Sequence, residues 1–578
     1  MKKLLLVLFS GLIALAVMLS AATGESSHGN IKTRWQEGSR GIELEVTGTV
    51  DFTDDDRDVK SLSPYGYFSL KESRWWVHSR RYQVTADGSG HLTRSYFVDG
   101  EAKPLDNEGQ AWLVQVMPVV IRETGAGAGP RVQRILRERG PSGVLAEIRL
   151  IHSDESKRVY LEELIQNGNL GPEQLSSAMH EARNIGSDDE KSGFLMGMAP
   201  IYLKDDLRDA LFGAVDTISS DDEHRRVLSE LVQKDPSGLD TLTLALRSAA
   251  KISSDDEKAT VLLEVAERYR GHEAIRRPYF KAADSISSDE ERRRVLSAVL
   301  RNDGDDRETL EDSLRSAAGI SSDEEKAGVL IEACHYYRED DAVRRAFFNA
   351  ANGISSDEEH ARVLTELAHH PGLKLATLQE TAKSAQRISS DEEKAKVLVE
   401  IAALSLQDVA ARSDFFDAVN SISSDEEHGR VLSDVVGKAG VASGALTQVV
   451  ESAARISSDE EKGKVLVQMA GMDMKNDGFR AAFFKATDGI SSDDEHGQVL
   501  SSLLKRRDLT TETVIDVIQS AAHISSDDVK ASVLKQVIDS YSGDPVVRSH
   551  LRGALESLQS NDEYRALMSA LSKQETAH

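Results

Sequence analysis

Hydrophobic and polar residues alternate in the N-terminal part of the chain. From Ile42 to Phe52 every second residue is apolar or glycine, and Glu, Thr and Asp residues lie between them. Successive side chains of a strand point to opposite faces, so this pattern predicts a half-buried β-strand. Further short strands, separated by Ser-Pro and Asp-Gly turns, are expected at residues 65–70, 82–86 and 92–98. We therefore predict a small antiparallel β domain of about four strands at residues 36–105, preceded by a disordered segment at residues 23–35.

From residue 107 onward the apolar residues follow the three- and four-residue spacing of a helix. Trp112, Val116 and Val120 share one face, and Gly125 is expected to end this helix. Pro118 lies inside the same pattern and predicts a kink or a break. We predict that residues 106–150 form a helical linker that caps the first repeat.

The remainder of the chain repeats itself. An Ile-Ser-Ser-Asp step recurs every 34 residues, from Ile218 to Ile524. Self-similarity at this period is typical of stacked helical hairpins. Apolar residues at helical spacing lie before and after each step, and the connectors are short, so the two helices of a repeat are expected to be antiparallel neighbours. The fold class predicted for residues 151–578 is mainly α, a right-handed α-solenoid of about 13 hairpins.

The serines and acidic residues of each step predict the start of a helix. In the repeat around residue 390, the Ser390 hydroxyl can accept a hydrogen bond from a free backbone N–H of the second helix. Glu393 is expected to reach back to the Ser390 amide and complete a capping box. The alternative is that the repeated carboxylates bind Ca²⁺ or a basic partner. We favour capping, because the step recurs wherever the hairpin recurs.

A second period, of 68 residues, is superimposed on the first. The residue after the acidic run alternates between a class with His224, Arg292, His360, His428 and His496 and a class with Lys258, Lys326, Lys394, Lys462 and Lys530. Histidines two layers apart lie about 20 Å from each other, whereas zinc needs ligands at about 2 Å. We interpret these histidines as surface or interface residues and predict no metal site.

Other candidate chemistry is sparse. Cys334 is the only cysteine, which excludes an internal disulfide, and we expect it to be a small buried hydrophobe. Residues 53–58 lack the spacing of a calcium loop and are interpreted as a solvated turn. Trp75-Trp76 and the aromatic residues of segment 65–68 are either a binding patch or, as aromatic residues in short strands usually are, part of the core.

Catalytic motifs are absent from suitable contexts. The chain has no nucleophile elbow, His-Glu-x-x-His motif, Walker loop or Gly-x-Gly-x-x-Gly turn between a strand and a helix. We therefore predict a protein that is not an enzyme, with no catalytic, cofactor-binding or metal-binding residues and no cofactor. Its binding residues are not identified by the sequence.

Targeting and charge narrow the class of partner. Lys2 and Lys3 precede an apolar run at residues 4–21, which predicts a signal peptide at residues 1–22 and a periplasmic or secreted protein. An uncleaved N-terminal membrane anchor is the alternative, since the run approaches the length that spans a bilayer. The net charge is −27, with the acidic excess in the repeats. Nucleic acid is excluded as a partner, because its binding depends on Lys and Arg neutralising phosphates.

The 34-residue hairpin resembles the helical-repeat superfamily that includes HEAT and tetratricopeptide arrays. The tetratricopeptide signature Trp-x-x-Leu-Gly-x-x-Tyr is missing from the repeats, so its peptide-carboxylate binding does not carry over. The segment ISSDEEKAKVLVEIA, residues 388–402, is also similar to repeat segments of bacterial antirepressor-type membrane metallopeptidases. This chain lacks their His-Glu-x-x-His motif and membrane-helix bundle, so the resemblance implies a binding or sensing module without the protease.

These observations together predict an exported, non-enzymatic scaffold. Its repeat surface is expected to bind a protein or peptide partner, with no small-molecule cofactor. The alternative is a ligand- or stress-sensing regulatory module of the cell envelope that acts through a membrane protein.

Overall fold

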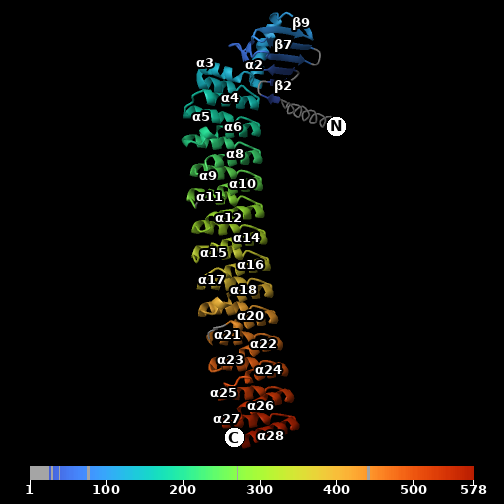
Figure 1. The fold of residues 1–578 in the computed structure, drawn as a ribbon, viewed down its shortest axis with the longest axis vertical. Helices are drawn as coiled ribbons and strands as arrows, with labels where there is room; N and C mark the ends of the chain where they lie inside the picture. Colours follow the sequence, from blue (N-terminus) through green and yellow to red (C-terminus); the bar gives the residue numbers. More distant parts are fainter. Residues whose placement is uncertain are drawn as a thin grey trace, which may run out of the picture. The chain divides into compact units, whose positions relative to one another are not determined.

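The computed structural model describes residues 25–27, 30–37, 40–74, 78–269, 271–438 and 443–577. This part of the chain contains nine β-strands followed by 27 α-helices (Figure 1). The chain forms two compact units, residues 1–268 and residues 269–578. The predicted signal peptide and Trp75-Trp76 lie outside the described residues. Within the described ranges, no helix combines the length and the apolar character needed to cross a membrane.

The N-terminal strands form an antiparallel sheet. Its order is β1-β2-β3-β6-β7-β8-β9, and β4 and β5 pair separately. The strands are β1 (Glu25–Ser27), β2 (Asn30–Glu37), β3 (Arg40–Thr47), β4 (Val50–Phe52), β5 (Val59–Leu62), β6 (Tyr67–Arg74), β7 (His78–Ala86), β8 (Leu92–Val98) and β9 (Glu101–Lys103). The antiparallel β domain is therefore confirmed, with more strands than the four expected.

Two details of the β domain differ from the sequence prediction. The single strand expected at residues 42–52 is divided at Gly48, which has a φ of 84° and leaves no room for a Cβ beside Ser63. The alternation resumes beyond this glycine, which conceals the turn. The disorder expected at residues 23–35 is wrong at residues 25–27 and from residue 30 onward, because β1 pairs with β2, and β2 pairs with β3 from Asn30 to Glu37.

Helix α2 (Asn107–Thr124) belongs to the β domain rather than to a linker. Its apolar face, including Trp112, Val116 and Val120, shares one core with the buried side of the sheet. The helix is not broken at Pro118, and it ends at Gly125, as predicted. The break lies in α3 (Ala128–Ile148) instead, where Gly140 has a φ of 66° and Pro141 follows.

Helices α3 to α28 form 13 hairpins in the described residues. Four lie in the first unit: α3, α4 (Asp154–Asn167), α5 (Pro172–Ala182), α6 (Asp188–Tyr202), α7 (Arg208–Val215, after a 3₁₀ turn at Asp205–Leu207), α8 (Asp221–Lys234), α9 (Leu239–Ala249) and α10 (Asp255–Ala266). Nine lie in the second: α11 (Glu273–Ala283), α12 (Asp289–Asp303), α13 (Arg307–Ala317), α14 (Asp323–Cys334), α15 (Asp341–Ala351), α16 (Asp357–Ala368), α17 (Leu375–Ala385), α18 (Asp391–Ser405), α19 (Val409–Val419), α20 (Asp425–Gly437), α21 (Ser443–Ala453), α22 (Asp459–Met469), α23 (Asp477–Thr487), α24 (Asp493–Leu504), α25 (Thr511–Ala521), α26 (Asp527–Tyr541), α27 (Pro545–Leu555) and α28 (Asn561–Ala577).

Each hairpin buries one stripe of each helix. In the hairpin of α17 and α18, Leu378 and Ala382 face Val397, Leu398 and Ile401 across the core, all at most 6% exposed. Odd-numbered helices pack on odd-numbered neighbours and even-numbered helices on even-numbered ones, as α17 does on α19 and α16 on α18. Each unit therefore has an odd layer and an even layer, which confirms the predicted stacking of hairpins.

In ten even helices the first acidic residue joins one hairpin to the next. Asp391 Oδ2 accepts hydrogen bonds from the backbone amides of Ser423 and Ser424, at 3.0 and 2.8 Å. The same double contact, which we call the aspartate clamp, is made by Asp154, Asp188, Asp221, Asp289, Asp323, Asp357, Asp391, Asp425, Asp459 and Asp493. It satisfies two loop amides that the helix itself cannot pair.

The aspartate clamp corrects the predicted capping box. The Ser390 hydroxyl does accept from the Glu393 amide, at 3.3 Å. The Ser390 amide, however, donates to Asp357 of the preceding hairpin, not to Glu393. The Glu393 carboxylate instead pairs with Lys396 at 2.6 Å. The cap is therefore shared between two repeats.

We predict that removing one clamp weakens the contact between two hairpins. Asp391→Ala should lower the free energy of unfolding by about 2–4 kcal/mol, because two hydrogen bonds to a carboxylate are lost. Its matched control is Glu392→Ala, which removes the next carboxylate, 65% exposed and paired only on the surface. Urea unfolding of the full chain measures both. Equal effects of the two substitutions would contradict a structural role for the clamp.

Candidate interaction surface

The alternating His and Lys residues lie between hairpins rather than on the surface. His360 is only 3% exposed, and its Nε2 lies 2.8 Å from Ser384 Oγ of the next hairpin. Ser384 donates to Asn352 Oδ1 at 2.7 Å, so the imidazole must donate to the serine. His224, His428 and His496 make the same contact with Ser248, Ser452 and Ser520. Of the two positions predicted, surface or interface, the structure shows the interface.

Burial keeps these histidines uncharged. It lowers the pKa of His360 and of His428 to about 4. Burial also lowers the pKa of His224 and His496, where the carboxylates of Asp216 and Asp488 oppose it. In the part of the chain that is described, no three His, Cys, Asp or Glu side chains converge on a metal position.

The lysine class makes a different contact at the same position. Lys394 is 5% exposed, and its Nζ donates to the Ser421 carbonyl at the C-terminal end of α19. Lys191, Lys326 and Lys462 donate to the equivalent carbonyls of Thr217, Gly353 and Gly489. The C-terminal end of a helix carries partial negative charge, so it suits an ammonium group. Two kinds of polar contact therefore alternate between hairpins, with the 68-residue period of the sequence.

Only one carboxylate of each acidic run remains free to face solvent. The first is in the clamp, and the third pairs with a basic residue of its own helix, as Glu359 does with Arg362 and Glu427 with Arg430. The second is exposed in successive hairpins: Glu290, Glu324, Glu358, Glu392, Glu426, Glu460, Asp494 and Asp528. The repeated acidic run is thus mainly structural, as the capping interpretation expected.

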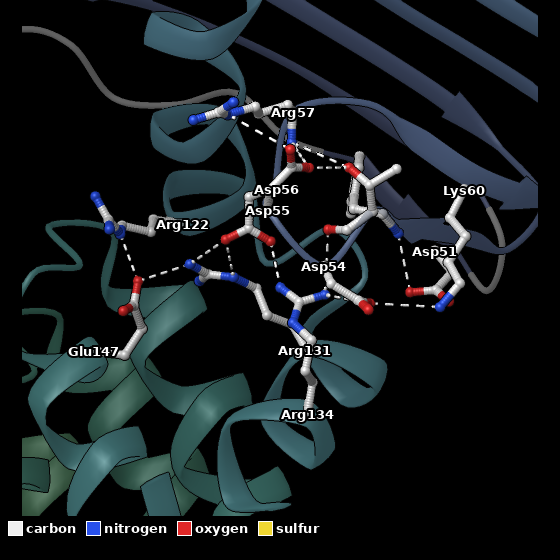
Figure 2. Close-up of polar contacts among 12 residues, drawn as sticks. Asp51, Asp54, Asp55, Asp56, Arg57, Lys60, Arg122, Arg131, Arg134 and Glu147 are labelled. Carbon is white, nitrogen blue, oxygen red and sulfur yellow. Dashed lines mark hydrogen bonds and ion pairs between the residues drawn. The ribbon is translucent and has the colours of Figure 1, made fainter. Parts of the chain in front are cut away.

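The turn at residues 53–58 is anchored at one residue, Asp56. Figure 2 shows Asp56 between two arginines of α3, Arg131 and Arg134. Arg131 Nε donates to Asp56 Oδ2 at 3.0 Å, and its Nη2 donates to Glu147 Oε1 at 2.8 Å. Only 15% of the Asp56 side chain is exposed. The predicted turn is present, and Asp54, Asp55 and Arg57 are exposed. The prediction missed the anchoring of Asp56, because the arginines that bind it lie some 75 residues further along the chain.

This ionic network stays charged although it is buried. Burial opposes the charge of Arg131, but the Tyr160 hydroxyl and the Asp56 carboxylate outweigh it, and the pKa of Arg131 is raised. Burial likewise raises the pKa of Glu147, but hydrogen bonds from Arg122 and Arg131 outweigh this, and the pKa is lowered. The network fixes the turn between β4 and β5 against the first hairpin.

The remaining sequence candidates do not form a site. Of the aromatic residues at 65–68, Phe68 is in the core and Tyr65 is 81% exposed, so they are not one patch. Cys334 is 2% exposed, and burial raises the pKa of its thiol. It therefore behaves as the buried hydrophobe that was predicted.

A series of arginines on the odd helices was missed by the sequence reasoning. Arg208, Arg276, Arg344, Arg412, Arg480 and Arg548 follow one another at 68-residue intervals. Arg276 binds Glu308 and Asp312 of the next odd helix, and Arg480 binds Asp516 in the same way. The 68-residue spacing of these arginines is visible in the sequence. Their partners are not, because they lie in neighbouring repeats.

No family model and no curated protein matches the chain. Among solved structures, a homology model of the full-length AP-3 complex matches with 10% identity, 70% of this chain, 95% of that chain and a TM-score of 0.25. Kap121p bound to Nup53p matches with 11% identity, 82% of this chain, 66% of that chain and a TM-score of 0.26. Kap121p bound to Ste12p matches with 12% identity, 82% of this chain, 65% of that chain and a TM-score of 0.25.

These distant likenesses concern the helical-repeat type of fold alone. They add no functional argument, and the resemblance to metallopeptidase repeat segments stays a prediction. The helical-repeat fold is shown by the stacked hairpins of the described residues themselves.

We predict that the buried histidines make stability depend on pH. Between pH 6.5 and about 4 the unfolded chain binds protons that folded His360 and His428 do not, so stability is full above pH 6.5 and falls as the pH is lowered. The loss is about 1.4 kcal/mol per histidine for each pH unit. Urea unfolding at pH 7.5 and pH 5 should show a smaller loss in the His360→Gln/His428→Gln variant. The exposed His335→Gln control should behave like the wild type, and an unchanged pH dependence in the double variant would refute the prediction.

We predict that Arg131 holds the turn between β4 and β5 on the first hairpin. Arg131→Met should destabilise the chain by about 3–5 kcal/mol, because Asp56 and Glu147 both lose their shared buried partner and keep only Arg134 and Arg122. Arg57→Met is the control: Arg57 is 58% exposed and pairs with exposed Asp55, so its effect should stay within about 0.5 kcal/mol. Thermal unfolding measures both, and an Arg131→Met variant as stable as the control would show that the network is dispensable.

Proposed function

We propose that the chain is a non-enzymatic scaffold that presents its repeat surface to a protein or peptide partner. One observation carries the proposal. The residues that recur in each hairpin are used in contacts between hairpins, whereas the outward positions of the even helices vary. Two such neighbouring positions hold Thr365 and Glu366 in α16, Val399 and Glu400 in α18, Val467 and Gln468 in α22, and Ser501 and Ser502 in α24.

This division supports specific recognition. A stack whose internal contacts are uniform can vary its outer face without loss of register. Variation confined to the outer face is what selective binding requires. A net charge of −27 argues against nucleic acid as the partner.

The site of action that we propose is the periplasm or the exterior of the cell. The support is the basic pair Lys2-Lys3 followed by the apolar run at residues 4–21. The same run supports the second candidate function, a regulatory module of the envelope, because an uncleaved run of this length can anchor the chain beside a membrane partner. N-terminal sequencing of the mature chain separates the two: cleavage near residue 22 favours the free scaffold.

We predict that one partner can be crosslinked from the repeats. A photo-crosslinking residue placed at Glu400 or Gln468 samples the even layer, and one at Lys383 or Glu451 samples the odd layer; all four positions are exposed. Tyr65 provides the matched position on the β domain. In cells that express the full chain, both positions of one layer should capture the same protein. Capture from Tyr65 alone, or no capture at any position, would contradict the scaffold proposal.

A further inference from the structure

The arginine series of the odd helices has three recurrent positions for its partners. The first lies three residues before the arginine, where Asp341 pairs with Arg344 at 2.6 Å. The second lies 32 residues after it, where Glu308 pairs with Arg276. The third lies 36 residues after it and holds the Asp312 partner of Arg276 and the Asp516 partner of Arg480, at 3.2 and 2.9 Å. A carboxylate in at least one of these positions pairs with Arg208, Arg276, Arg344 and Arg480. Arg548 has none and donates instead to the carbonyls of Ser542 and Gly543.

Arg412 lacks a carboxylate at all three positions. The corresponding residues are Val409, Gly444 and Gln448. Arg412 is nevertheless 8% exposed, and its Nε has no hydrogen-bond partner. Among the residues that the structure describes, none forms an ion pair or a side-chain hydrogen bond with it. The Nε atoms of Arg208 and Arg276 also lack a hydrogen-bond partner, but those arginines have carboxylates beside them. Arg412 has no counter-charge among the described residues, which is unfavourable for a buried guanidinium.

A second buried polar group, at the end of the preceding hairpin, is also unsatisfied. Seven residues before Arg276 and Arg344 lie Tyr269 and Tyr337, whose hydroxyls meet the Thr309 and Thr377 hydroxyls at 3.2 and 3.1 Å.

The positions that correspond to these for Arg412 hold Ser405, at the end of α18, and Ala445, in α21. Ser405 is 0% exposed, and its hydroxyl has no partner. The charge of Arg344 acts on the Tyr337 hydroxyl, which indicates that the serine and arginine positions lie near each other. Arg412 therefore lacks the tyrosine, the threonine and the carboxylates together. At Arg208 and Arg480 the tyrosine alone is missing, where Ile201 and Asp473 stand.

Exposed apolar residues flank this place. Val409 lies three residues before Arg412 on α19, and so on the same helix face, as the Asp341–Arg344 pair demonstrates for α15. Val409 is 75% exposed. Leu375, 39% exposed, occupies the equivalent position on α17, which packs against α19. A ligand that reaches Arg412 therefore meets apolar surface beside a positive charge.

We propose that Arg412 anchors a carboxylate of a partner polypeptide, whose adjacent apolar side chain packs on Val409. The proposal rests on the scaffold function and assigns it a specificity-determining residue. A guanidinium binds a carboxylate through two parallel hydrogen bonds. Elsewhere the acidic chain repels an acidic segment, so an unpaired arginine fixes both the position and the register of docking.

The test is a selection of displayed random peptides on the immobilised full-length chain, followed by affinity measurement. The selected peptides should combine a carboxylate with a neighbouring apolar residue. Replacing that carboxylate by its amide, or Arg412 by Leu, should weaken binding at least about tenfold. Leu is the residue that intervening hairpins carry at this position, as at Leu378 and Leu310, so the substitution suits the fold. Arg344→Leu is the matched control and should bind the peptides as the wild type does.

A second variant supplies the missing counter-charge from the chain itself. Gln448→Asp places a carboxylate where Asp516 lies relative to Arg480. It should raise the midpoint of thermal unfolding and abolish peptide binding together, an outcome that a purely structural role for Arg412 does not give.

The remaining outcomes overturn the proposal in distinguishable ways. If peptides bind Arg412→Leu as they bind the wild type, or need no carboxylate, the anchor is wrong and the scaffold function stands. If inorganic phosphate displaces the peptides and phosphorylated peptides bind more tightly, the ligand group is a phosphate. If no peptide is selected and no partner is crosslinked from the repeats, both the anchor and the scaffold function fail.

Discussion

In each unit, one contact recurs from hairpin to hairpin: a carboxylate accepts hydrogen bonds from two backbone amides of the following hairpin. The aspartate that makes this contact is the first residue of an even helix, and its partners are the two serines that begin the next even helix. The aspartate thus acts on two helices at once: it lies at the positive end of its own helix dipole and satisfies loop amides of the neighbour. A shift of one residue between hairpins would break both hydrogen bonds, so the clamp sets the register in which the apolar stripes meet.

The other buried polar groups depend on that register. With the hairpins aligned, the fourth residue of an even helix reaches the C-terminal end of the next odd helix. A lysine such as Lys394 binds a carbonyl there, and a histidine such as His360 binds a serine. Both solutions satisfy a buried polar side chain, but only the histidine can change charge near neutral pH. Because stacking uses the recurring residues, the outward positions are free to serve recognition. Arg412 is the exception, a buried group of the recurring set that lacks its recurring partner.

Most of the architecture could be predicted from the sequence, because its determinants are local and repeated. The 34-residue period gives the hairpins, and Ser390 was correctly read as a helix cap. The predictions failed where a residue has a distant partner. The capping box assigned the Ser390 amide to Glu393, whereas the aspartate that binds it, Asp357, lies 33 residues earlier. The anchoring of Asp56 was missed because Arg131 is remote in sequence. β2 was missed because its residues are mostly polar and its order comes from pairing with β3. No binding residue was predicted, since the lack of partners at Arg412 appears only when repeats are compared through their contacts.

The most direct test of the central claim is amide hydrogen exchange in the native chain at neutral pH. If the aspartate clamp holds the hairpins in register, the amides of Ser423 and Ser424, and their equivalents in other repeats, should exchange as slowly as amides inside the helices. Exchange as fast as that of the loop at residues 505–509, which has no such clamp among the described contacts, would contradict the account.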